Sequence, residues 1–224
     1  MFRKRININY TDILQKKDAE EMFKTMPFNF PSYFKSIPKE RFHLKYKKFL
    51  PFLKTIKTCP GFINLYKRSI LVTSPYDIFI IFNENDIDFQ RVGVMPDYKA
   101  AIIHENDQFL MYTNNKKYKF ILKIQLPITL NSKVPLLLSE SSYHLSDFKK
   151  LSGIIPSNYY NDLNFFIPIK KDINEIYIKK GDPLFLLTPL CVDKVKLKFN
   201  ENKTNHRPEL TFTGLKKYIM DKII

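Results

Sequence analysis

The sequence predicts a mainly β protein whose body is a jelly roll or β-sandwich of the double-stranded β-helix type. Roughly ten short apolar runs are separated by polar turns, which is the spacing of sandwich and barrel strands. Near residue 195, Val195, Leu197 and Phe199 alternate with lysines, the period of a half-buried strand. The sequence also predicts an N-terminal helix and a strap rich in proline and aromatic residues before this body, and a short C-terminal helix after it.

The first 58 residues are expected to form a region of their own. Residues 1–10 are predicted to be a polar, basic arm. A short helix follows, because Thr11 suits an N-cap and Pro27 ends the apolar stripe. The predicted organisation is therefore residues 1–58 as arm, helix and strap, residues 59–214 as the β-sandwich or jelly-roll body, and residues 215–224 as the C-terminal helix.

Residues 27–58 are expected to be an irregular strap, because prolines recur from Pro27 to Pro60 and prevent long helices and central strands. The aromatic side chains of the strap require burial. They either anchor the strap on the body or form an interface with a partner subunit, and both alternatives stay open. The candidate interface residues are Phe28, Phe30, Tyr33, Phe34, Phe42, Tyr46, Phe49 and Phe52.

The body is predicted to consist of short strands joined by turns. Turns are expected at residues 74–77, 113–116 and 179–182, where Pro, Asn and Gly favour them. Gly214 is expected to precede the terminal helix at residues 215–223. The predicted strands are 69–73, 78–82, 89–95, 108–113, 118–126, 134–138, 165–169, 175–178, 184–188, 192–199 and 209–213.

The composition excludes several classes of protein. Two cysteines exclude a disulfide scaffold, and no apolar run approaches the ~18 residues that span a bilayer. The basic N-terminus is not followed by an apolar segment, so neither secretion by a signal peptide nor membrane insertion is expected. The net charge of +15 comes from 37 basic and 22 acidic residues. The excess of Lys, Ile, Phe, Asn and Tyr is typical of an AT-rich genome, so part of this charge is expected to reflect codon usage.

The charge is unevenly distributed, and it leaves a nucleic-acid contact open. Residues 1–58 and 115–224 each carry a net +9, whereas residues 59–114 carry −3. Lysines lie beside aromatic residues in both basic flanks, a mixture that single-strand binders use. The candidate nucleic-acid contacts are Lys45, Lys47, Lys48, Lys116, Lys117 and Lys119.

The sequence gives no catalytic, cofactor-binding or metal-binding residue. Iron-dependent jelly-roll hydroxylases use a His-x-Asp or His-x-Glu pair on one strand, and none of the four histidines begins one. Those histidines are His43, His104, His144 and His206. With five glycines the chain also lacks phosphate-cradling loops. The question of an enzyme stays open and leans towards none, with no cofactor expected.

Three segments, 57–62, 74–78 and 178–184, resemble an uncharacterised protein family of tailed phages, often marine ones. The shared features are a Cys-Pro segment, a Pro-x-Asp turn and a Gly-Asp-Pro-Leu strand. The residues that carry the resemblance are Cys59, Pro60, Pro75, Asp77, Gly181, Asp182 and Pro183. We expect structural roles for them: Cys59 buried, Asp77 accepting a backbone N–H, and Gly181 at positive φ. The resemblance implies a viral source and no known activity.

The leading functional hypothesis is a non-catalytic phage protein, either a virion component or a protein-interaction module. The alternatives are an iron-dependent jelly-roll hydroxylase and a nucleic-acid-binding accessory protein. Other protein subunits, in a homo-oligomer or a virion, are the expected partners, with nucleic acid reachable through the basic flanks. The host cytoplasm or the virion is the expected location. Removal of residues 1–58 is expected to leave the body folded but to abolish assembly or partner binding.

Overall fold

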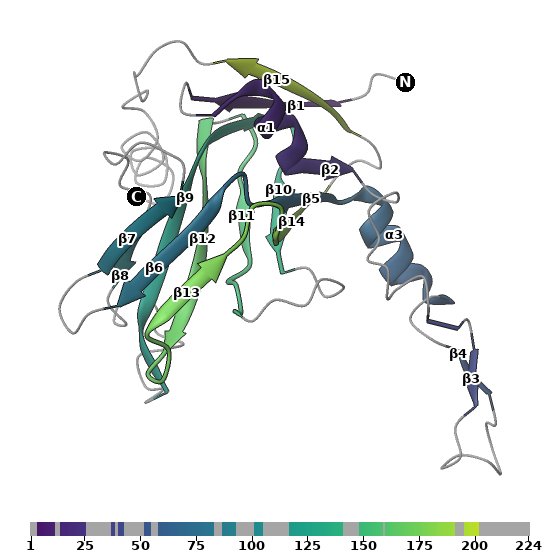
Figure 1. The fold of residues 1–224 in the computed structure, drawn as a ribbon. Helices are drawn as coiled ribbons and strands as arrows, with labels where there is room; N and C mark the ends of the chain where they lie inside the picture. The colour runs from purple at the N-terminus through teal and green to yellow at the C-terminus, as the bar shows by residue number, and fades with distance from the viewer. Residues whose placement is uncertain are drawn as a thin grey trace, which may run out of the picture.

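The protein is mainly β, as predicted, and Figure 1 shows its strands gathered into several twisted sheets. In this computed structural model the described residues are 4–11, 14–25, 37–38, 40–42, 52–54, 58–82, 87–92, 101–104, 117–140, 148–158, 160–190 and 195–201. The predicted strands at 108–113 and 209–213, the turn at 113–116 and the helix at 215–223 lie wholly outside these residues, and the predicted strands at 89–95 and 192–199 lie partly outside them. Within the described part, neither helix is long and apolar enough to cross a membrane.

The first sheet has the strand order β12-β9-β1-β15, with β8 paired to β9 beside it. Its members are β12 (Tyr160–Lys170), β9 (Tyr118–Ser132), β1 (Lys4–Tyr10), β15 (Val195–Glu201) and β8 (Ala101–His104). β1 is central, because it pairs antiparallel with β9 on one side and parallel with β15 on the other.

This central strand corrects the expectation of a polar arm at residues 1–10. Ile6, Ile8 and Tyr10 are buried in the core, while Asn7 and Asn9 alternate with them on the other face. Alternation with period 2 buries one face of a strand, and it decides the structure here despite the basic composition. Residues 4–25 are therefore integrated into the sheets of the body rather than standing before it.

The second sheet has the order β11-β10-β14-β5-β2. Its members are β11 (Gly153–Ile155), β10 (Leu136–Ser139), β14 (Pro183–Pro189), β5 (Ile70–Thr73) and β2 (Phe23–Thr25). α1 (Lys16–Met22) leads directly into β2. It begins after Gln15 rather than at the expected cap Thr11, and it buries Ala19 and Met22 against the core.

The third sheet continues the second around a corner. β6 (Asp77–Phe82) follows β5, and β13 (Glu175–Ile178) precedes β14, so one long antiparallel ribbon bends from sheet to sheet. β7 (Ile87–Val92) pairs with the other edge of β6. Strands that change sheets at bends are a common way to close a two-layer core.

One apolar core joins all three sheets. The Phe165 ring on β12 lies 5.9 Å from the Phe185 ring on β14, and both side chains are fully buried. The Phe23 ring on β2 lies 6.0 Å from Phe199 on β15, and Phe82 on β6 lies 5.3 Å from Phe120 on β9. These ring pairs connect the layers at three places, so the sheets form a single body.

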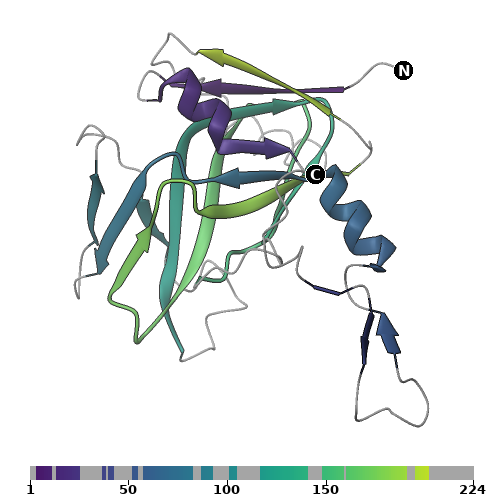
Figure 2. The same ribbon diagram turned by 45° about the vertical axis from the view of Figure 1, so that its right-hand side comes forward.

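The strap region differs most from its expected form. β3 (Glu40–Phe42) and β4 (Phe52–Lys54) pair as an antiparallel hairpin, and α3 (Pro60–Arg68) connects that hairpin to β5. Both views show the hairpin beyond α3 and away from the sheets (Figures 1 and 2). The described hairpin of the strap therefore projects from the body. We call residues 39–68, which include β3, β4 and α3, the arm; this segment is distinct from the basic arm predicted at residues 1–10.

Candidate functional site

The residues of the Pro-x-Asp and Gly-Asp-Pro-Leu segments meet at the corner between the second and third sheets. The backbone N–H of Ser74 donates to the Asp182 carbonyl, and that of Gly181 donates to the Ser74 carbonyl, each at 2.8 Å. Asp77 Oδ1 accepts from the backbone N–H of Lys180 at 2.6 Å. Two turns 103 residues apart in the sequence are thereby hydrogen-bonded into one corner, with Pro75 buried in it and Pro183 at the start of β14.

Side chains complete this corner. Asp182 Oδ2 accepts from the backbone N–H of Lys179 at 2.8 Å, and Ser74 Oγ donates to the Tyr76 carbonyl at 2.6 Å. Asp77 thus accepts a backbone N–H, as expected, but from the facing turn rather than from its own. These contacts satisfy backbone groups that a bent ribbon removes from its ladder, so Ser74, Asp77 and Asp182 hold the shape of the corner.

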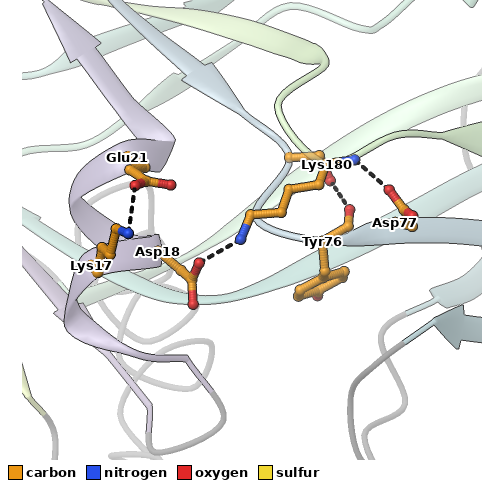
Figure 3. A network of polar contacts seen from close by, with 7 residues as sticks. Lys17, Asp18, Glu21, Tyr76, Asp77 and Lys180 are labelled. Carbon is orange, nitrogen blue, oxygen red and sulfur yellow. Dashed lines mark hydrogen bonds and ion pairs between the residues drawn. The ribbon is translucent and has the colours of Figure 1, made fainter.

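Lys180 links the corner to α1 (Figure 3). Its Nζ donates to Asp18 Oδ1 at 2.6 Å. This hydrogen bond raises the pKa of Lys180 above its usual value of 10.5; burial acts the other way, and nearby carboxylates add to the rise. The Lys180 side chain is 53% exposed, so the pair contributes little to stability, about 0.2–1 kcal/mol for exposed pairs in general.

Gly181→Ala is expected to lower the free energy of unfolding by about 1–2 kcal/mol, the penalty of a side chain in the left-handed region. Gly181 has φ of +88°, and no atom lies within 4 Å of an added Cβ. The expected loss of stability therefore comes from the backbone conformation and not from a steric clash. Gly153→Ala is the matched control, because Gly153 also has open space but no positive φ. Urea denaturation measures both; equal effects at the two positions contradict the prediction.

The Cys-Pro segment begins a helix. Cys59 is the N-cap of α3 and Pro60 its first residue, a position that proline favours. Cys59 is half-buried, which corrects the expectation of a buried thiol. α3 buries only Tyr66, and its end is held on β14, where Ser69 Oγ and Thr188 Oγ1 lie 2.6 Å apart.

Two of the eight predicted interface residues lie among the described residues. Phe42 and Phe52 are opposite each other in the β3–β4 register. The other six, Phe28, Phe30, Tyr33, Phe34, Tyr46 and Phe49, lie outside the described residues. The aromatic interface therefore stays a prediction, and only Phe42 and Phe52 of it belong to the described hairpin.

The predicted lysine contacts are not brought together within the described residues. Lys117 is exposed in the turn before β9, and Lys119 Nζ donates to Asn174 Oδ1 at 3.0 Å. Lys45, Lys47, Lys48 and Lys116 lie outside the described part. Of the histidines only His104 is described; it is on β8, with its ring 5.8 Å from that of Phe166. No group of three metal-ligating side chains gathers among the residues described.

The outward face of the first sheet is the feature that the sequence analysis missed. One residue from each of four neighbouring strands forms a row across this face. In strand order the row is Lys198 on β15, Asn7 on β1, Asn131 on β9 and Tyr160 on β12, each paired in register with the next. The next row consists of Asn200, Asn9, Thr129 and Asp162 from the same four strands. Lys196 and Arg5 are paired beside the first row. We call these ten residues the polar face.

Hydrogen bonds fix the second row of the polar face. Asn200 Nδ2 donates to Asn9 Oδ1 at 3.1 Å, and Thr129 Oγ1 donates to Asp162 Oδ1 at 3.3 Å. Arg5, Lys196 and Lys198 are exposed, whereas the amide residues are half-buried. The signal for this face was present in the sequence, because Arg5, Asn7 and Asn9 alternate with buried apolar residues as the lysines of β15 alternate with Leu197 and Phe199.

No protein-family profile, curated protein or solved structure matches this chain.

Proposed function

We propose that this chain is a non-catalytic phage protein that acts as a self-associating subunit, as a virion component does, first in the host cytoplasm and then in the virion. The projecting arm is the observation that carries the proposal. The arm consists of two strands and a helix that project from the sheets. Such a segment can bury its apolar side chains only by contact with another molecule. The partner to which the proposal commits is a second copy of this chain.

The attachment of the arm supports a docking role. α3 is anchored at its C-terminal end, where Arg68 donates to the Pro189 carbonyl at 3.2 Å and Tyr66 is buried. Phe62 and Leu65, in the middle turns of the helix, are each 37% exposed. The helix therefore has one end fixed to the body and one apolar flank turned to solvent, and it carries the β3–β4 hairpin at the far end (Figure 2).

Charge supports a second copy as the partner. The arm, residues 39–68, contains nine basic residues and one acid, a net +8. The segment of β6 and β7, residues 77–92, contains four acids and one base, a net −3. In both views β6 and β7 lie on the opposite side of the body from the arm (Figures 1 and 2). Complementary surfaces at opposite sides pair between successive copies, in a head-to-tail contact that gives rings or filaments.

The expected result is that the full chain self-associates and that removal of the β3–β4 hairpin of the arm makes it monomeric. Residues 39–57 are replaced by a short Gly-Ser linker, and sedimentation velocity measures the assembly at low and high salt. Substituting Lys45, Lys47 and Lys48 by Gln is expected to weaken self-association roughly tenfold, since exposed ion pairs contribute about 0.2–1 kcal/mol each. High salt is expected to act in the same direction.

A matched variant replaces Lys149, Lys170 and Lys171, exposed lysines outside the arm, by Gln and is expected to leave self-association unchanged. A charge swap is sharper: Glu84, Asp86 and Asp88 changed to Lys disrupt assembly, and the same three arm lysines changed to Glu restore it. A full chain that stays monomeric at low salt up to its solubility limit overturns the proposal. So does a chain lacking residues 39–57 that assembles normally.

The jelly-roll assignment is part of this proposal, since jelly rolls are common in capsid subunits. Its support is that the first and second sheets face one another across one apolar core, with Phe165 and Phe185 in contact between them.

A further inference from the structure

We propose that the polar face binds single-stranded nucleic acid, with the phosphate backbone along β15 and β1 and the bases over β9 and β12. This surface is separate from the arm, and its role does not depend on self-association. The inference rests on the order of chemical groups across the four strands: cations on β15 and β1, then amides on β1 and β9, then a carboxylate on β12.

The cationic edge provides the charge complementarity. Arg5, Lys196 and Lys198 are exposed on adjacent parallel strands, with Arg5 and Lys196 in register. Lys196 and Lys198 are about 6.6 Å apart along the strand, two residues at 3.3 Å each. The opposite side of β15 packs inward, where Phe199 contacts Phe23, so the lysines point away from the body. Three exposed cations on two neighbouring strands attract a polyanion and orient its backbone along them.

The central strands provide groups that recognise bases. Asn7 and Asn131 face each other in register, and each amide offers both a donor and an acceptor, as base edges do. Their strands lie about 4.8 Å apart, so the four-strand row extends over roughly 14 Å. An open sheet face of this width suits unstacked bases of a single strand, which sheet-based readers contact in the same way.

The far strand completes the arrangement. The backbone of Tyr160 is opposite Asn131 in the row that begins with Lys198. Asp162 is the one acid of the polar face, and it lies three strands away from the lysines. A carboxylate there repels phosphate but accepts from a base amino group, which orients the strand with its backbone on β15.

Fluorescence anisotropy of a labelled single strand of about 20 nucleotides tests the proposal. At about 50 mM salt we expect micromolar binding, with a log–log salt slope near −2 because three cations each neutralise one phosphate. Changing Lys196 and Lys198 together to Gln is expected to weaken binding at least tenfold and to reduce the slope by about 1.4. Asn131→Ala is expected to weaken binding without changing the slope, because amides contact bases rather than phosphate.

The matched control changes Lys170 and Lys171 to Gln, since both are exposed and lie at the end of β12 away from the polar face. It is expected to change the affinity by less than about twofold. Equal loss in the two double variants overturns the proposal in favour of a general basic surface. Absence of binding at low salt, tighter binding of duplex DNA, or equally effective competition by heparin also overturns it, the last in favour of an acidic polysaccharide.

Discussion

A chain that lacks residues 1–11 is expected not to fold. β1 is the inner strand between β9 and β15, and it contributes Ile6, Ile8 and Tyr10 to the core. Its removal leaves β9 and β15 with unpaired backbone groups and opens the apolar layer beneath them. Circular dichroism and urea denaturation measure the outcome. A truncated chain with a cooperative transition close to that of the full chain contradicts this result.

The control for this truncation is the internal deletion of residues 39–57, which removes the hairpin of the arm. It is expected to retain the urea midpoint of the full chain, because the hairpin lies apart from the sheets (Figure 1). The sequence alone predicted that all of residues 1–58 can be removed without unfolding the body. The structure leads us to expect instead that residues 39–57 can be removed and residues 1–11 cannot. Within residues 1–58, β1, α1 and β2 belong to the sheets and the core.

Phe165→Ala is expected to lower the free energy of unfolding by about 3–5 kcal/mol, the range for a buried phenylalanine. Phe165 is fully buried and contacts Phe185 across the two sheets, so truncation leaves a cavity at their junction. Phe166→Ala is the control, since Phe166 is next in sequence but half-buried on the outward face. Urea denaturation compares the two variants. Similar losses in both contradict the layered core described here.

Strands with a clear apolar pattern and a turn at each end were predictable from the sequence. The strand at 175–178 was predicted with its observed bounds, because polar turns limit it on both sides. β9 is longer than predicted, since it continues past Pro127 to Ser132. Proline is tolerated there because the β9–β12 register is irregular between Asp162 and Asn164, where a ladder hydrogen bond is not required.

Pairing between distant strands could not be predicted. The residues of the corner were identified from the sequence, and Gly181 has the expected positive φ, but their joining across 103 residues depends on register. The polar face was missed for the same reason: each strand shows only two or three polar positions, and the rows exist only after four strands align. The helix α3 was not predicted, because the nearby prolines and Gly61 disfavour a helix, although Pro60 is its first residue.

The pairing of β1 with β15 also sets the order in which the molecule can form during translation. Asn9 and Asn200, joined in the polar face, are 191 residues apart. At ordinary elongation rates roughly 10–40 s separate the synthesis of these two strands. Through that interval the nascent chain exposes the apolar side of β1. The backbone groups on the β15 side of β1 stay unpaired even after β9 has been synthesised. Such high contact order slows folding, so production of the protein is expected to depend on chaperones that shield the waiting strand at the ribosome.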